Sequence, residues 1–503
     1  MTRSTGGQSV IVLPQIGTPY QQGSFRELLG GLNNAVSDEL ISPDELSDAE
    51  NYVPDPENAG VLIKRSGITQ VSSQQTPKIT SIYEGVHGIW AGLPTDIIDS
   101  SGSSQSLTLT SSDSQDWASL ASYDIMVNGA EEKKYNGATW TDLGGTPPNF
   151  KYIEVYNRFL FGAGHDKGKV RWSDPQDPET WSATHEWNLT GDSNDDVTGL
   201  KAYRDVLIAF TEKAFFHLRG YHELGINITY RGEPGCTSNK SIVSTPYGIF
   251  WWGEDGIYFS PDGFQTVNIS ELKIPKTIDG MNKAKFNLIH GLWNPLRQRI
   301  EFYGFSSGAT THDMAIFYYP RVGVSNVGGV QVGSFWVQGG AGVEMGCSGV
   351  VTVTGERVVY LGSAAGSGYI YQQTGSDDDG TVITALLETQ RNSTEYGPSS
   401  MKRLKNLIPV FELTGTASVS YGIYLDNANT VTKSWPIDLS LSGGFTLGSS
   451  LLGTGAFGEP DLAHEVEIGW SEKFRKIKHR IYDEDENRVK VRGILTEGYL
   501  VNV

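Results

Sequence analysis

Two runs of carboxylates are the first places where this chain could do chemistry. One is Asp192-Ser-Asn-Asp-Asp196, and the other consists of Asp377, Asp378 and Asp379. Clustered carboxylate oxygens suit Ca²⁺, but neither run has the glycine and the distal glutamate of an EF-hand loop. Solvated turns explain both runs more simply. The sequence therefore predicts no metal site, and residues 377–379 are only weak candidates.

Hydrolytic chemistry would need two carboxylates that face each other across a substrate. Glu254, Asp255 and Asp262 are available, but they lie in Gly253-Glu-Asp-Gly256 and Pro261-Asp-Gly263. Turns of this kind need Asp-Gly for backbone geometry alone. The chain has no Gly-x-Ser-x-Gly elbow, no phosphate-binding Walker loop and no dinucleotide fingerprint. We therefore expect that the chain is not an enzyme and that it binds no cofactor.

Tryptophans and basic residues are the remaining candidates for binding. Trp172, Trp181, Trp187, Trp251 and Trp252 could form a shelf for sugars, although packing between strands explains most of them. The basic candidates could contact DNA phosphates or an acidic neighbouring subunit, with a solvated strand face as the alternative. They are Arg65, Lys402, Arg403, Lys405, Arg475, Lys476 and Lys478.

The elements that must position these residues are short β-strands joined by tight turns. Residues 248–259 alternate bulky apolar side chains around Gly253-Glu-Asp-Gly256, which is typical of a β-propeller blade. Comparable turns, such as Asn157-Arg158, recur at roughly 40–50 residues, the period of propeller blades. The fold class is therefore mainly β, with an irregular propeller-like platform over 78–375. On the basis of the same period we expect about five to seven blades.

The residue patterns at the two ends of the chain differ from that of the platform over 78–375. Residues 376–503 are expected to form a C-terminal antiparallel β-sandwich. Residues 1–77 are expected to form an N-terminal arm and docking segment. Within it, residues 1–24 form a flexible arm or a strand ordered by a partner. Ser42 and Pro43 suit the start of a short helix over 43–51.

Composition limits the partners. The chain has 503 residues and a net charge of −19, which argues against tight, general binding of nucleic acid. Cys236 and Cys347 are the only cysteines, so buried free thiols are expected rather than a disulfide scaffold. We find no signal peptide and no apolar run of roughly 18 residues, the length of a membrane span. We therefore expect a soluble product made in the cytoplasm.

Several short motifs follow one another in a fixed order along the chain. The N-terminal part of the series is Gly30-Gly-Leu-Asn-Asn34, Leu46 to Asn51 and Leu62-Ile-Lys-Arg-Ser-Gly67. The later part is Trp172-Ser-Asp-Pro to Trp181, Gly235-Cys236 with Ser241-Ile-Val243, Trp252 to Tyr258, Trp293-Asn-Pro with Ile300-Glu-Phe302, and Phe317-Tyr-Tyr-Pro320. This ordered series resembles the tail nozzle and packaged-DNA stabilisation proteins of short-tailed bacteriophages. The resemblance covers about residues 25–375, and the polar insertion near 95–117 departs from it.

The resemblance implies a structural virion protein in the phage tail. It implies a homohexameric ring that forms the distal part of the DNA ejection channel and helps to retain the genome. Implied partners are other copies of the chain, the tail adaptor and other tail proteins. A tail fibre, needle or plug protein and transient, non-specific double-stranded DNA in the lumen are further partners. The alternatives are a glycan-binding adsorption propeller and a propeller glycosidase.

Overall fold

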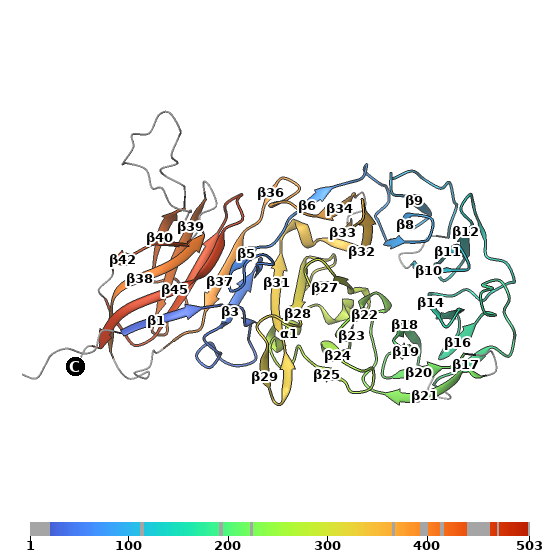
Figure 1. Ribbon diagram of the computed structural model, residues 1–503, viewed down its shortest axis with the longest axis horizontal. Helices are drawn as coiled ribbons and strands as arrows, with labels where there is room; N and C mark the ends of the chain where they lie inside the picture. The colour runs from blue at the N-terminus through green and yellow to red at the C-terminus, as the bar shows by residue number, and fades with distance from the viewer. Residues whose placement is uncertain are drawn as a thin grey trace, which may run out of the picture.

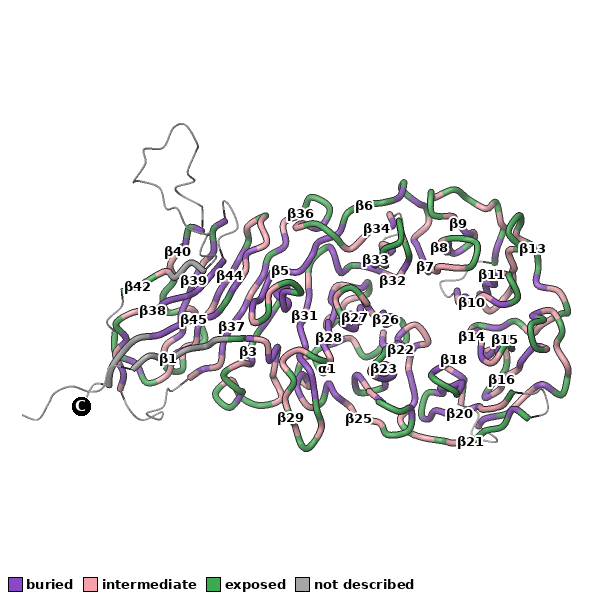
Figure 2. The backbone as a smooth tube through the Cα atoms, in the orientation of Figure 1, coloured by how far each residue is buried: buried purple, intermediate pink, exposed green. Residues whose placement is uncertain are grey.

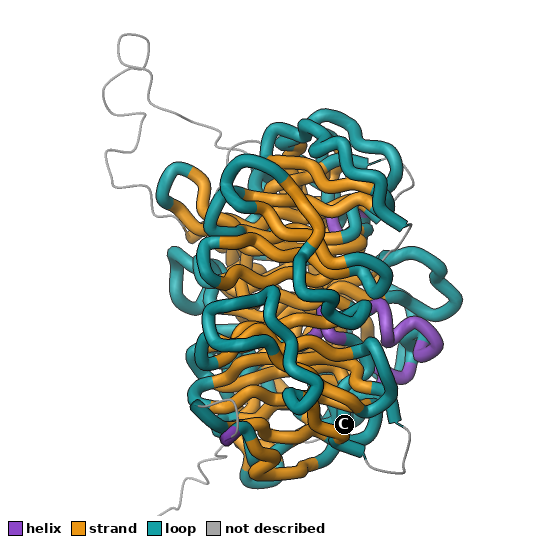
Figure 3. Tube along the Cα trace, turned by 90° about the vertical axis from the view of Figure 1, so that its right-hand side faces the viewer, coloured by secondary structure: helices purple, strands orange, loops and turns teal. Residues whose placement is uncertain are grey.

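The computed structural model describes residues 21–110, 115–190, 195–221, 225–364, 368–392, 401–412, 417–439, 463–469 and 472–500. A ring of small sheets lies at one end of the molecule and a pair of larger sheets at the other (Figure 1). Strands make up the body, and the helices are short (Figure 3). The mainly β fold class with a propeller-like platform is confirmed. Among the described residues, no helix is long and apolar enough to cross a membrane.

The ring consists of seven sheets, which we number as blades 1 to 7 along the chain. Blade 1 has β7 (Ser81–Glu84), β8 (Ile89–Leu93) and β9 (Asp96–Asp99). Blade 2 has β10 (Asp116–Leu120), β11 (Tyr123–Val127), β12 (Glu132–Tyr135) and β13 (Trp140–Asp142). Blade 3 has β14 (Tyr152–Tyr156), β15 (Phe159–Ala163), β16 (Lys169–Trp172) and β17 (Glu186–Asn188).

Blades 4 to 6 continue the antiparallel pattern. Blade 4 has β18 (Val197–Tyr203), β19 (Val206–Thr211), β20 (Phe215–Arg219) and β21 (Asn227–Gly232). Blade 5 has β22 (Val243–Thr245), β23 (Gly248–Trp252), β24 (Ile257–Ser260) and β25 (Val267–Asn268). Blade 6 has β26 (His290–Asn294), β27 (Arg299–Gly304), β28 (Met314–Tyr319) and β31 (Ser334–Gly339).

Blade 7 closes the ring with strands from both ends of the platform. It combines β32 (Met345–Val353), β33 (Glu356–Ser363) and β34 (Ile370–Gln373) with β6 (Ile68–Gln70). β6 pairs antiparallel with β34, and β32 packs against β7 of blade 1. Since β6 precedes blade 1 in sequence, the N-terminal segment fastens the last blade to the first.

The tight turns follow from residues that tolerate a positive φ. Asn157 and Arg158 join β14 to β15 with φ of 48° and 74°, and Tyr156 pairs directly with Phe159. Two central residues with positive φ are the signature of a hairpin turn that matches the twist of its strands. The turn predicted at Asn157-Arg158 is therefore confirmed, as is the hairpin around Gly253-Glu-Asp-Gly256 between β23 and β24.

The second domain is a pair of sheets. The first sheet has the order β4 (Tyr52–Pro54), β5 (Leu62–Lys64), β45 (Lys490–Leu500), β38 (Lys402–Glu412) and β41 (Ala463–Glu465). β1 (Gln21–Arg26) pairs with β45, and β42 (Ile468–Gly469) and β43 (Lys473–Phe474) pair with β38. The second sheet has β3 (Glu45–Glu50), β37 (Ala385–Thr389), β44 (Ile477–Asp483), β39 (Ser418–Leu425) and β40 (Lys433–Asp438), with β2 (Gly31–Leu32) on β3.

One sheet joins the two domains. β3 lies parallel to β31 at the pair Glu50 and Val337, so blade 6 and the second sandwich sheet form one ten-stranded sheet. A single apolar cluster runs from Phe317 and Trp336 in blade 6 to Leu387 and Phe411 in the sandwich. Buried backbone accordingly continues from one domain into the other (Figure 2).

The remaining elements decorate this body. They are the hairpin of β29 (Ser325–Val327) and β30 (Val330–Val332), the pair β35 (Asp377–Asp378) and β36 (Thr381–Val382), the helix α1 (Pro275–Asp279), and 3-10 turns at Asn239–Ser241, Lys283–Leu288 and Ala341–Val343.

The N-terminal segment differs from the expectation in two ways. The helix predicted over 43–51 is wrong, because these residues form β3, which pairs with β37. The part of the predicted arm that is described, residues 21–24, belongs to β1 and pairs with β45 of the same chain. Residues 1–20 lie outside the described residues. Strands from 21–64 thus complete the sandwich, and 68–70 complete the ring.

Candidate functional site

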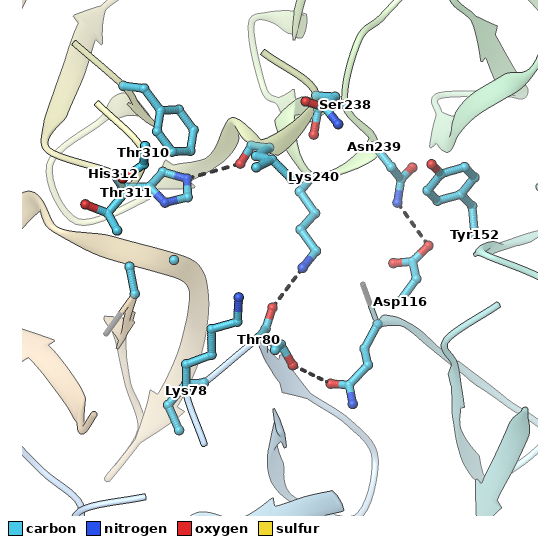
Figure 4. A pocket seen from close by; sticks show the side chains of 17 residues that line it. Lys78, Thr80, Asp116, Tyr152, Ser238, Asn239, Lys240, Thr310, Thr311 and His312 are labelled. Carbon is cyan, nitrogen blue, oxygen red and sulfur yellow. Dashed lines mark hydrogen bonds between the residues drawn. The ribbon is translucent and has the colours of Figure 1, made fainter. Parts of the chain in front are cut away.

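The axis of the ring holds two adjoining cavities of about 200 and 250 Å³. Gln115, Asp116, Asn239 and Lys240 line both cavities, and the first strands of most blades supply much of the remaining wall. Residues 287–288, 305 and 310–312 complete the smaller cavity, which Figure 4 shows. The lining mixes apolar side chains with polar groups and with charges of both signs. It is therefore the candidate functional site of the ring.

Asp116, the first residue of β10, is the central acid of this site. Its Oδ2 accepts hydrogen bonds from the Ile153 backbone N at 2.9 Å and from Asn239 Nδ2 at 3.0 Å. Burial, reinforced by the charge of Glu154, raises the pKa of Asp116 to about 6. The carboxyl is therefore poised to titrate just below neutral pH.

Three lysines, Lys78, Lys201 and Lys240, line the cavities. Lys201 Nζ lies 3.1 Å from Glu154 Oε2, and this neighbouring carboxylate raises the pKa of Lys201. Lys240 Nζ donates to the Thr80 carbonyl oxygen at 2.8 Å, as Figure 4 shows. The Glu154 carboxylate thus forms an ion pair with Lys201, which lines the same cavity.

The histidines beside the cavities are held neutral. Nδ1 of His290 lies 2.9 Å from Ser348 Oγ, and its Nε2 lies 2.9 Å from the Met345 carbonyl oxygen. Burial lowers the pKa of His290 well below its usual range and lowers that of His312 to about 4. Burial also raises the pKa of the Cys347 thiol to about 12. These groups are therefore uncharged near pH 7.

The size of the two cavities limits what they can hold. A water molecule occupies about 30 Å³ in the liquid, so each cavity has room for a few waters or one small solute. Neither cavity could hold one base pair of duplex DNA, whose major groove alone is about 12 Å wide and about 8.5 Å deep. Asp116 and Glu154 line the larger cavity, but each already has partners within the protein.

Asp116 gives the stability of the ring a defined pH dependence. The pKa of Asp116 in the folded chain lies above its unfolded value, so the folded state binds more protons between about pH 4 and pH 6. Its contribution to the free energy of unfolding therefore falls as pH rises through this window. We expect Asp116→Asn to gain stability relative to the unaltered protein as pH rises from 4 to 7, measured by urea unfolding.

The control for this experiment is Asp142→Asn, which removes an exposed carboxylate of the same blade. A difference between Asp116→Asn and the unaltered protein that stays constant across this pH range would contradict the assignment.

The predicted basic residues lie away from the axis, and several are neutralised within the chain. Lys476 Nζ lies 2.5 Å from Glu39 Oε1, and Lys478 Nζ lies 2.5 Å from Glu388 Oε2. Lys402 is buried in β38 and donates to the Arg475 carbonyl oxygen at 2.5 Å. Burial lowers the pKa of Lys402.

The other members of this set are more accessible. Arg475 and Lys405 are exposed, and Arg403 is half-buried. Contact of the basic set with a partner stays a prediction.

Arg65 is an internal residue that fastens the two domains. Its guanidinium is bidentate to Asp378, with Nη1–Oδ1 at 2.8 Å and Nη2–Oδ2 at 2.6 Å. Nε donates to Asn51 Oδ1 at 2.9 Å, and Nη2 donates to the Gly339 carbonyl oxygen at 2.9 Å. Both charged side chains are almost completely buried, with exposures of 3% and 2%. The surface role expected for Arg65 is therefore replaced by a structural one.

Asp377, Asp378 and Asp379, the weak metal candidates, have structural roles. Asp378 is committed to Arg65 and to the backbone N of Gly342. Asp377 Oδ1 accepts from the Gly380 N at 2.6 Å, and Asp379 occupies the turn with φ of 51°. Within the described ranges no group of three His, Cys, Asp or Glu residues could hold a metal ion. Residues 192–194 of the other run lie outside those ranges.

The tryptophans do not form an exposed shelf. Trp251, Trp252 and Trp172 are buried in the blades. Trp181 and Trp187 are half-buried and donate their indole N–H to carbonyl oxygens of Pro178 and Ile226. These residues therefore serve packing, which removes the observation that favoured glycan binding. Cys236 and Cys347 are buried free thiols, as expected.

No family model matches this sequence, and no curated protein matches it. Among solved structures, the chain is similar to the WD40 domain of Pan2 from Neurospora crassa. The TM-score is 0.41 and the identity 8%, and the match covers 62% of this chain and 96% of that one. The description of the ring as a propeller accordingly stands on its own blade order.

The residues of the axial site were missed at the level of sequence. Asp116, Glu154 and Lys201 lie on the first strands of blades 2, 3 and 4, and Lys240 precedes that of blade 5. Such positions carry no motif, and only the blade boundaries could reveal them. Glu254, Asp255 and Asp262, the carboxylates considered for hydrolysis, lie instead in the turns before and after β24.

Proposed function

We propose that this chain is a structural virion protein. In this proposal it is a subunit of a tail nozzle or hub ring that forms the distal part of a DNA ejection channel and helps to retain the packaged genome. The observation that carries the proposal is the location of the N-terminal motifs that resemble such proteins. They meet at the junction of the two domains.

Gly30-Gly-Leu-Asn-Asn34 supplies one part of this junction. Asn33 Nδ2 donates to Glu45 Oε2 at 2.7 Å, and Asn34 Oδ1 accepts from the backbone N of Lys276 at 3.0 Å. Glu45 also forms a buried ion pair with Lys273, between the sandwich and the ring. The motif therefore ties β3 to the segment around α1.

Asn51 and Arg65 supply the other part through their bonds to each other, to Gly339 and to Asp378. Together the three motifs fix the angle between propeller and sandwich. A subunit of a closed ring needs such rigidity, because heterologous contacts must close by rotation. The resemblance therefore concerns the residues that set the shape of the subunit.

The channel in this proposal lies between copies of the chain. The cavities within one propeller are too small for a duplex, so the lumen must be enclosed by several subunits. The net charge of −19 would disfavour adhesion of DNA to the wall of such a lumen.

The decisive experiment is mass photometry and negative-stain microscopy of the purified chain, alone and with tail proteins of its phage. We expect rings of about six copies with a central opening; the copy number is the one that the resemblance implies, and the contacts must close by rotation. A chain that stays monomeric even with these partners would overturn the proposal. Glycan binding and hydrolysis should then be screened.

A further inference from the structure

Two arginines from different domains converge on the linker between β5 and β6. Arg297 lies in the turn between β26 and β27 of blade 6, and its guanidinium donates to Ser66 Oγ. Arg488 lies in the turn between β44 and β45 of the sandwich, and its Nε donates to the Lys64 carbonyl oxygen at 2.9 Å. Residues 64–66 thus hold both guanidiniums at one place on the domain junction.

Neither arginine has a carboxylate partner among the residues that the structure describes. The contrast is Arg299, whose Nε lies 2.8 Å from Glu301 Oε1 and whose Nη1 donates to the Tyr319 hydroxyl. Arg488 Nη2 is buried and has no hydrogen-bond partner within the described part of the chain. Leaving a charged donor unsatisfied in a buried place costs free energy, so a missing acceptor is indicated.

The electrostatics of this cluster agree with a deficit of negative charge. Burial, together with repulsion from Arg299 and Arg488, lowers the pKa of Arg297 to about 10. Burial also lowers the pKa of Arg488, while Asp55 and Glu57 attract it from the sandwich side. Asp55 is itself paired with Lys490 at 2.8 Å. Asp55 is therefore shared with another base, and Glu57, which is exposed, forms no ion pair with either arginine within the described part of the chain.

We infer that Arg297 and Arg488 form a binding site for a small oxyanion of the phosphate class at the domain junction. An arginine fork presents parallel N–H donors that match the oxygens of a phosphate group. Both side chains are half-buried, so part of each guanidinium can be reached from solvent, while Arg488 Nη2 lies beneath the surface. A bound anion would link blade 6 to the sandwich through the two guanidiniums.

The test is a calorimetric titration of the full chain with inorganic phosphate at constant ionic strength. The unaltered protein should bind one phosphate saturably, with a dissociation constant at or below about 1 mM. Arg297→Gln and Arg488→Gln should each weaken binding at least about tenfold, as expected for loss of one charge-assisted contact. Arg357→Gln, at an exposed arginine of blade 7, is the matched control and should bind as the unaltered protein does.

The inference is overturned if the unaltered protein shows no saturable binding up to about 10 mM phosphate. It is also overturned if both Gln variants bind as tightly as Arg357→Gln. If a Gln variant does not fold, Arg297→Lys and Arg488→Lys replace it, and these should still bind more weakly because lysine lacks the fork.

A second titration, with a short DNA duplex as competitor, separates two sources of the phosphate group. Displacement of bound phosphate by the duplex assigns the site to a nucleic-acid backbone. Its persistence assigns the site to the free ion.

Discussion

Asp378→Asn is expected to lower the free energy of unfolding by about 3–5 kcal/mol, the usual cost of removing one partner of a buried ion pair. The substitution leaves the Arg65 guanidinium charged and almost completely buried without its bidentate acceptor. Because the same carboxylate accepts the Gly342 backbone N–H, the 3-10 turn at Ala341–Val343 should loosen as well. Urea unfolding followed by tryptophan fluorescence measures the loss.

Asp142→Asn is the matched control, because the Asp142 side chain is 83% exposed and pairs with Lys133 at the surface. We expect it to change stability by less than about 1 kcal/mol. The double variant Arg65→Met/Asp378→Leu should lose less than Asp378→Asn, since it leaves no unpaired buried charge. A cost for Asp378→Asn no larger than that for Asp142→Asn would show that the pair does not hold the junction.

Local turn chemistry made much of the ring predictable. Asn157 and Arg158 have positive φ, as does Gly256 at the end of Gly253-Glu-Asp-Gly256, and such angles favour tight turns. Short runs of apolar residues between such turns then define hairpins, with β15 and β23 buried at every position, and repeated hairpins define blades. Which strand completes blade 7 could not be predicted, because the pairing of β6 with β34 joins residues about 300 positions apart.

The predicted helix over 43–51 failed because tertiary contacts outweighed local capping signals. Glu45, which favours a helix start, has its carboxylate drawn into a buried ion pair with Lys273. Ala49 pairs with Leu387 of β37, which gives the backbone a strand partner. Both contacts join residues that are more than 200 positions apart, so no local pattern could reveal them.

The candidate residues show the same limit at the level of side chains. Arg65 and Lys476 are both basic residues in β-rich segments, and nothing local distinguishes them. The fold buries Arg65 against Asp378 and places Lys476 beside Glu39 near the surface. Arg297 and Arg488 were not singled out, because their shared location depends on two turns from different domains. Charged residues can be counted from a sequence, but the fold decides which of them pair with an opposite charge.

Trp336→Ala is expected to cost about 3–5 kcal/mol, as for other tryptophans truncated in a packed core. Trp336 is fully buried on β31, next to the strand pairing that joins blade 6 to the sandwich. Its apolar cluster includes Phe317 in the blade and Phe411 in the sandwich, so the cavity would weaken both domains. Leu296→Ala, at a side chain that is 73% exposed, should stay within about 0.5 kcal/mol.

Hydrogen exchange distinguishes one cooperative unit from two independent domains in the Trp336→Ala protein. Amides in β27 of blade 6 and in β39 of the sandwich should lose protection together, because one sheet and one core contain both. Loss confined to blade 6, with β39 unchanged, would mean that the ten-stranded sheet does not couple the domains. Because the two domains would then open separately, that outcome would also weaken the case for a fixed angle between propeller and sandwich.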